Sequence, residues 1–210
     1  MKINFFLLFT LFTSVLSVLT SCEENEIPKE ELVLALEIEP FSFHNEKGSG
    51  PYSFQMPDDW TLIPVSAFDG DFCQERIDLA THLYKYPGES EMQGIIDLRY
   101  NRVPNKKYIE DLIFDSFSLV DGEQKHFGDP GSREYLEISD KIRNIYGQII
   151  ECEGNGVASP IHFYLTDNVS NYIHGKLIIK YDDYKKAKQS IKHIKTGILE
   201  MINSFEWLKD

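Results

Sequence analysis

The chain has 210 residues, 42% of them hydrophobic, and carries a formal net charge of −13 at pH 7. This length is enough for one domain with a sizeable core that needs no stabilising metal or disulfide. Because the chain is acidic and shows no basic stripe to neutralise phosphates, its composition argues against nucleic acid as a partner.

The first 21 residues have the pattern of a secretory signal peptide. Lys2 is their only charged residue, and an uncharged run follows from Ile3 to Ser21. Leu19-Thr20-Ser21-Cys22 matches a bacterial lipobox, in which small residues precede the cleavage point and a cysteine becomes the new N-terminus. A plain signal peptide with an incidental cysteine is the alternative.

With a lipobox, we expect Cys22 to carry a diacylglycerol and an N-acyl lipid, and we expect no other cofactor. Several acyl chains give stable anchoring, since each buried methylene contributes about 0.8 kcal/mol. The membrane is then a partner through this lipid anchor. The protein is expected in the cell envelope, at the outer membrane or the periplasmic face of the inner membrane.

After the signal, residues 22–30 are expected to be the lipidated cysteine with an acidic tether, and residues 31–210 a single domain. Hydrophobic alternation predicts several strands in the first half of this domain. They are Glu31–Glu39, Tyr52–Pro57, one or two short strands around Ile77–Lys85, and Gly94–Tyr100.

A helix is predicted to begin at Pro104-Asn105 and to end near Gly122. Its apolar stripe is Tyr108, Ile109, Leu112, Ile113 and Phe117. Four strands are predicted next, at Glu134–Ser139, Ile142–Glu153, Ile161–Thr166 and Tyr172–Lys180, with a hairpin turn at residues 167–171.

The chain closes with a predicted helix that Asp182 or Asp183 can cap. Its apolar stripe is Ala187, Ile191, Ile194, Ile198, Met201, Ile202 and Phe205. This order of elements predicts an α+β fold, a single domain with two helices packed on an antiparallel sheet.

Two cysteines remain besides Cys22. In an oxidising compartment, Cys73 and Cys152 either form one disulfide or are two buried thiols that never meet, and the sequence leaves both open. No metal-ligand spacing accompanies them. We find no catalytic motif, and the pairs Asp58-Asp59 and Asp182-Asp183 lie beside element ends, where capping is the commoner use. We therefore expect no enzymatic activity, no catalytic residues and no metal.

Three features allow a functional and a structural interpretation. If the hairpin turns at Val169, His162 and His174 project from one face, either as two metal ligands lacking a third or as ordinary surface or half-buried histidines. The segment Gly154-Asn155-Gly156-Val157-Ala158-Ser159-Pro160 is a candidate contact loop or a tight structural turn. Trp207 is either an anchor or an exposed hot spot.

The second half of the chain resembles the gliding motility lipoprotein GldD family. The resemblance rests on Tyr146–Glu151, then Gly154–Pro160, Phe163–Asp167 and Gly175–Leu177, and finally the aromatic tail Ser204–Trp207. The first half agrees more loosely, and the chain departs from the family pattern in residues 58–93 and before the last helix. The sequence therefore resembles a divergent member.

This resemblance implies a non-enzymatic envelope lipoprotein, an accessory component of gliding motility and type 9 secretion machinery that acts by binding other envelope proteins. The α+β pattern is also similar to Mog1/PsbP-like domains, by analogy of fold alone. The alternative function is a small-ligand or substrate-binding lipoprotein at the cell surface, which uses the concave face of its sheet.

Overall fold

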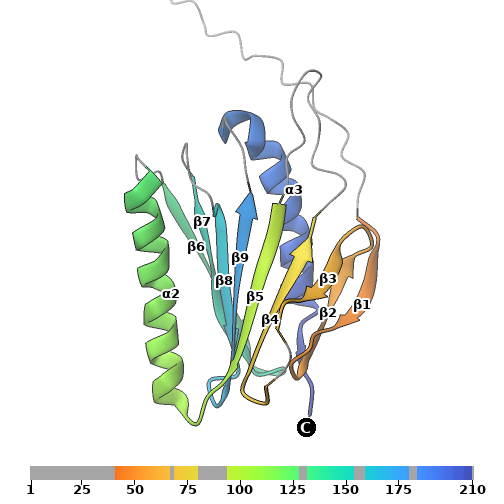
Figure 1. Ribbon diagram of the computed structural model, residues 1–210, viewed down its shortest axis with the longest axis vertical. Helices are drawn as coiled ribbons and strands as arrows, with labels where there is room; N and C mark the ends of the chain where they lie inside the picture. Colours follow the sequence, from red (N-terminus) through yellow and green to blue (C-terminus); the bar gives the residue numbers. More distant parts are fainter. Residues whose placement is uncertain are drawn as a thin grey trace, which may run out of the picture. The chain divides into compact units, whose positions relative to one another are not determined.

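Figure 1 shows the computed structural model of the protein. The structure describes residues 41–66, 69–79, 94–127, 132–153, 159–179 and 184–209. All of these lie within one compact unit, Glu39–Asp210. The predicted strand Glu31–Glu39 and the greater part of the one around Ile77–Lys85 lie outside the described residues.

Alternating apolar residues build a seven-stranded antiparallel sheet in the order β3-β4-β5-β9-β8-β7-β6 (Figure 1). Its strands are β3 (Thr61–Pro64), β4 (Phe72–Asp78), β5 (Gly94–Arg102), β6 (Arg133–Asp140), β7 (Ile145–Cys152), β8 (Ile161–Thr166) and β9 (Asn171–Ile179). A smaller antiparallel sheet has the order β1-β2-β10, from β1 (Phe43–Lys47), β2 (Tyr52–Pro57) and β10 (Glu206–Trp207).

The strand predictions for the second half are confirmed to within three residues. β8 begins and ends as predicted. β7 begins three residues later than expected, because Asp140 forms a turn instead. Its Oδ1 accepts hydrogen bonds from the backbone N–H groups of Ile142 and Arg143, both at 3.0 Å. The hairpin between β8 and β9 turns as predicted, with Asn168 at a φ of 59° and Asp167 accepting three backbone N–H bonds.

Helix α2 (Lys106–Phe127) begins where the sequence predicts. Asn105 Oδ1 accepts a hydrogen bond from the Lys107 N–H at 3.0 Å and so caps the first turn. The predicted end near Gly122 is wrong, because the helix continues to Phe127. A glycine inside a helix costs only about 1 kcal/mol relative to alanine, so Gly122 does not end the helix. Tyr108, expected in the apolar stripe, is exposed.

Every residue of the apolar stripe predicted for helix α3 (Tyr184–Asn203) is buried. Phe205, just beyond the end of the helix, is buried as well. The two predicted capping residues, Asp182 and Asp183, lie outside the described residues. Neither α3 nor any other described helix is long and apolar enough to cross a membrane.

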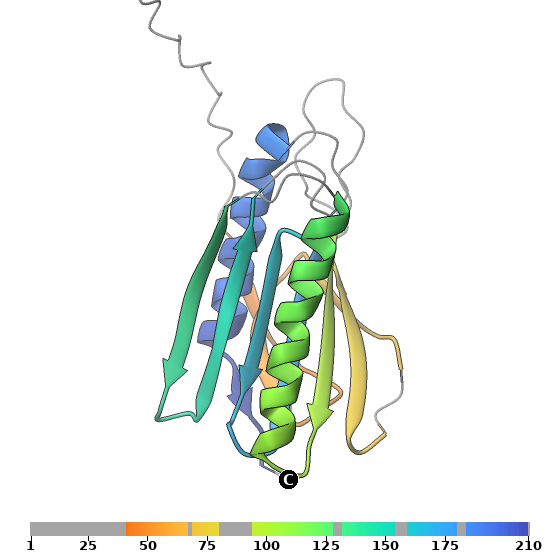
Figure 2. The ribbon, with the colours of Figure 1, turned by 90° about the vertical axis from the view of Figure 1, so that its left-hand side faces the viewer.

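The two helices lie on opposite faces of the seven-stranded sheet (Figures 1 and 2). The face toward α3 and the smaller sheet holds the main core, which includes Ile96, Leu98, Phe163 and Leu177. The face toward α2 holds a smaller cluster of Val120, Ile150 and Cys152, with Phe117 against it. Figure 2 shows that α2 crosses only part of its face and leaves β6 and β7 to one side.

A buried carboxylate joins the two sheets. Glu75 on β4 is 1% exposed, and its oxygens accept 2.5 Å hydrogen bonds from the Tyr52 hydroxyl and from the Ser49 backbone N–H. Burial, and then the charge of Glu75, raises the pKa of Tyr52 far above its ordinary value. The phenol therefore stays protonated and donates to the carboxylate, as a buried charge requires.

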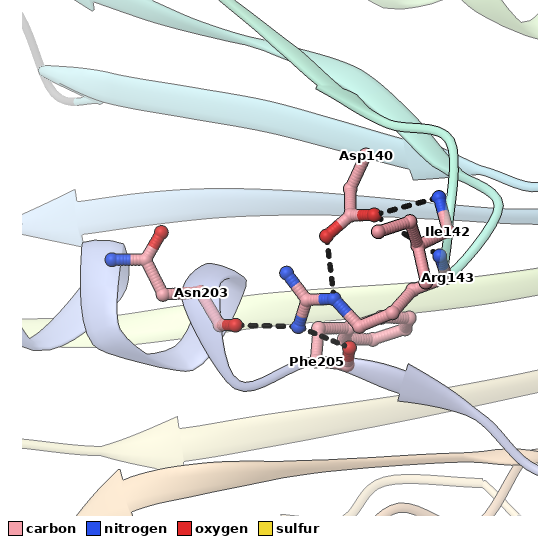
Figure 3. Close-up of polar contacts among 5 residues, drawn as sticks. All are labelled: Asp140, Ile142, Arg143, Asn203 and Phe205. Atoms are coloured by element: carbon pink, nitrogen blue, oxygen red, sulfur yellow. Dashed lines mark hydrogen bonds and ion pairs between the residues drawn. The ribbon is translucent and has the colours of Figure 1, made fainter.

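An arginine clamps the C-terminal segment to the turn between β6 and β7 (Figure 3). Arg143 Nη1 donates to the carbonyl oxygens of Asn203 at 2.5 Å and Phe205 at 3.1 Å, while its Nε donates to Asp140 Oδ2 at 2.7 Å. The Asn203 carbonyl belongs to the last residue of α3 and the Phe205 carbonyl follows it, at a helix end where carbonyl groups lack intrahelical partners. The clamp thus fixes the chain where it leaves α3 and enters β10.

Candidate functional site

The face of the sheet under α2 carries an in-register row of polar side chains. The row runs across six strands through Gln74, Arg99, His174, Tyr164, Gln148 and Glu137. Each pair of neighbours is directly opposite, so their side chains share one face. A core-facing row would be apolar, and this one therefore marks the sheet face on which to look for a site.

Helix α2 packs over part of this row. The Tyr172 hydroxyl lies 2.5 Å from Ser116 Oγ and donates to the Leu112 carbonyl at 3.3 Å. The Phe117 ring meets the Tyr164 ring edge-on, with centroids 6.4 Å apart. Tyr164 in turn stacks on Tyr172 at 6.0 Å, with 18° between the ring planes. These contacts hold Tyr164 in a fixed orientation beside the helix.

A groove of about 300 Å³ opens next to these rings, between α2 and strands β6, β7 and β8. Its polar lining residues are Glu137, Tyr146, Gln148, Tyr164, Thr166 and Asn168. Ile113 of α2 forms part of its helix side. Lysine and arginine are absent from the described residues that line it, so its only formal charge is the carboxylate of Glu137.

Gln148 is the most informative residue of the groove. Its Oε1 is buried and has no hydrogen-bond partner among the described residues, although such an acceptor normally has one. Burial, followed by the Glu137 charge, raises the pKa of Tyr164. The Tyr164 phenol is therefore a hydrogen-bond donor at neutral pH, on the strand position that pairs with Gln148.

The two histidines lie as the hairpin register predicts. Tyr164 pairs with His174, and the rings of His162 and His174 are 6.0 Å apart. His162 is 2% exposed, so it is more buried than the expected surface or half-buried position. Burial, then the neighbouring His162, Lys176 and Arg99, lowers the pKa of His174 to about 4. The described residues contain no group of three or more His, Cys, Asp or Glu placed to hold a metal.

Cys73 and Cys152 are buried thiols and do not form the disulfide that the sequence allowed. Strands β5, β9 and β8 separate their strands, which places them about four spacings of roughly 4.8 Å apart. A disulfide needs Cα atoms within about 7 Å. They also face opposite sides of the sheet, because Cys73 belongs to the main core and Cys152 to the cluster under α2.

Two predicted site elements lie wholly or mainly outside the described residues. Cys22 is one of them. Of the candidate contact loop Gly154–Pro160, the structure describes only Ser159 and Pro160, both buried. The Pro160 carbonyl accepts a 2.8 Å hydrogen bond from the Cys152 N–H. The end of the loop is therefore fixed to β7.

Trp207 is half-buried in β10, where it pairs with Tyr52 of β2. Its ring packs edge-on against Phe205, with centroids 4.8 Å apart, and against the main core. Of the two interpretations, the structure favours the anchor over the exposed hot spot.

Strand β6 forms one edge of the seven-stranded sheet. It is eight residues long, and it exposes Tyr135 on one face and Leu136 on the other. It contains no proline or lysine, but it carries four other charged side chains, which also limit pairing at an edge: Arg133, Glu134, Glu137 and Asp140. The opposite edge strand, β3, has four residues and ends at Pro64. Of the two edge strands of the seven-stranded sheet that the structure describes, β6 is therefore the better suited to accept another strand.

Sequence reasoning did not find the groove or the edge. Tyr146 and Gln148 alternate with buried Ile145, Gly147 and Ile149, so the strand pattern did indicate a polar face. The pairing of Glu137 with Gln148 depends on the order of strands in the sheet. This order follows from long-range pairing, which a single sequence does not reveal.

Comparison with known proteins gives one family. The family model of the gliding motility lipoprotein GldD matches residues 23–207. A search of the curated proteins finds no match.

Proposed function

Because the chain belongs to the family of the gliding motility lipoprotein GldD, we propose that it is an accessory component of gliding and type 9 secretion machinery that acts by binding other envelope proteins. Family membership implies a lipid-anchored protein of the cell envelope. The non-enzymatic role, the link to secretion and the mode of binding are the proposal.

The exposed β6 edge is the observation that carries a binding role. Backbone groups on an unpaired edge can form a ladder with an extended segment of another protein, while side-chain contacts give specificity. Tyr135 and Leu136 offer apolar contacts on the two faces. Glu134 and Glu137 are exposed on the same strand, which favours a partner segment with basic residues.

The anchor places this edge at a membrane. We propose that Cys22 receives the lipid and that the acidic residues after it serve as the tether. Cys22→Ala should remove lipid labelling and leave an uncleaved precursor, since the cysteine thiol accepts the diacylglycerol. Normal lipid labelling of this variant would contradict the anchor.

Affinity purification from native membranes tests partner binding. The tagged full-length protein is extracted in mild detergent, and coeluting proteins are quantified by mass spectrometry. Leu136→Lys places a charge on the β6 edge. Leu119→Lys on α2 is the matched control, since Leu119 is 50% exposed and Leu136 is 48% exposed.

We expect secretion or motility components to coelute with the wild type and with Leu119→Lys, and to fall at least about tenfold with Leu136→Lys, a change of about 1.4 kcal/mol. Equal recovery with both variants would contradict binding at β6. If a deletion within Gly154–Pro160 abolishes recovery while Leu136→Lys does not, the predicted contact loop is the binding surface instead.

A further inference from the structure

We propose that the groove between α2 and strands β6–β8 binds a neutral saccharide unit. This inference rests on other observations than strand addition at β6, because the groove lies on the α2 face of the sheet, where Glu137 and Ile138 are the β6 residues that line it. Its volume of about 300 Å³ is at the lower end of the range for small-molecule sites. That size suits one or two sugar rings better than a large ligand.

The polar groups of the groove match a ligand that both donates and accepts hydrogen bonds. Gln148 Oε1 has no donor among the described residues, and the Tyr164 phenol, whose pKa burial raises, is protonated and can donate. Thr166 Oγ1 already accepts from the Asn168 N–H at 3.0 Å, so its proton remains to be donated. Sugar hydroxyls serve as donor and acceptor at once, and several of them lie on one ring.

The groove also offers aromatic rings to the apolar faces of a sugar. Tyr146 and Tyr164 both line it. Tyr164 contacts both Tyr172 and Phe117, so its ring is already ordered and little side-chain freedom is lost when a ligand meets its hydroxyl. The C–H groups on one face of a pyranose ring pack well on such a ring.

The charge and polarity of the lining argue against anionic, strongly cationic and purely apolar ligands. An anion would meet the Glu137 carboxylate with no lysine or arginine from the described lining to neutralise it. A strongly cationic ligand would find a single, exposed carboxylate. A purely apolar ligand would leave the buried Gln148 Oε1 without a donor, which costs about 1–3 kcal/mol.

A glycan array tests the proposal with the full-length protein in detergent. The array carries neutral N-acetylhexosamine oligomers, which represent cell-wall glycan, and neutral surface polysaccharides, together with charged glycans. Gln148→Leu removes the buried acceptor while nearly keeping side-chain volume. Gln55→Leu is the control, a half-buried glutamine on β2 outside the groove.

We expect neutral glycans to bind, with affinity reduced about tenfold in Gln148→Leu and unchanged in Gln55→Leu. The subset that binds identifies the source of the sugar. Absence of neutral binders, a preference for charged glycans, or equal affinity in Gln148→Leu would each overturn the proposal.

Thermal unfolding separates a binding role from a structural one. If Gln148 serves a ligand, Gln148→Leu relieves a buried acceptor that has no partner, and Tm should stay the same or rise by about 2–4 °C. A fall in Tm of that size would assign Gln148 to the fold and overturn its role in the groove.

Discussion

At the scale of single residues, the sheet face under α2 holds polar side chains that are buried or half-buried. His162, His174 and Tyr164 lie in adjacent strands beneath α2, and each is removed from water to a different degree. Removing an imidazole from water disfavours its charged form. The lowered pKa of His174 is the result, and it makes this face sensitive to acid.

Acidification should therefore destabilise the protein through His174. Its pKa is about 4 in the folded chain and about 6.5 in an unfolded one, so the unfolded state binds more protons between these values. Stability from this residue is complete above about pH 6.5 and is lost as the pH falls toward 4, by at most about 3 kcal/mol.

Urea unfolding at pH 7 and pH 4.5 measures this effect. His174→Gln should lose less free energy of unfolding between the two pH values than the wild type does. An equal loss in both proteins would show that His174 is not the group responsible.

At the scale of elements, the surroundings of two glycines decide whether a side chain can be added at each position. A Cβ at Gly147 on β7 would lie 2.0 Å from the Tyr164 carbonyl oxygen, whereas one at Gly122 on α2 meets nothing. The first glycine is required by close backbone approach. The second glycine lies within a helix, where glycine is less favourable than alanine.

Two alanine substitutions should thus act in opposite directions. Gly147→Ala should lower the free energy of unfolding by about 1–3 kcal/mol, because the strands must separate to admit the methyl group. Gly122→Ala should raise it by up to about 1 kcal/mol through helix propensity. Chemical denaturation measures both, and destabilisation by Gly122→Ala would contradict the open position assigned to it.

Arg143 should stabilise the C-terminal segment through its fork of donors. Arg143→Lys keeps the charge, but one ammonium nitrogen cannot take the positions of both Nε and Nη1, so we expect a loss of about 1–2 kcal/mol. Arg99→Lys is the control, an exposed arginine paired with Asp97, and should change stability by less than about 1 kcal/mol.

Amide hydrogen exchange locates the effect of Arg143→Lys. Protection should fall in residues 203–207, from the last residue of α3 to the end of β10, and remain in β4 and β5. Unchanged protection at the C-terminal end would mean that the clamp contributes nothing to holding it.

The elements differ in how well the sequence predicts them. Apolar periodicity predicts β8, β9 and α3 closely, because burial on one face fixes which residues are apolar. The end of α2 was predicted too early because Gly122 was taken as a stop, although an exposed helix position admits glycine. The β6–β7 turn was missed because Asp140 and Arg143 form it with side chains.

At the scale of the whole molecule, the fold leaves two features uncovered. Both helices pack on the sheet faces, yet within the described part of the chain no further strand pairs with β6 and the adjoining groove is open. The α+β class and the family could be predicted from the sequence. The edge and the groove could not, since both depend on which strands pair, and pairing is decided by the assembled core.

Photocross-linking in cells tests the central claim, that the β6 edge binds other envelope proteins, most directly. A photoreactive amino acid replaces Leu136 in one full-length variant and Leu119 in the other, because the two side chains are equally exposed on different elements. We predict cross-linked products with envelope proteins at Leu136 and none at Leu119. No product at Leu136, or the same products at both positions, would contradict the account.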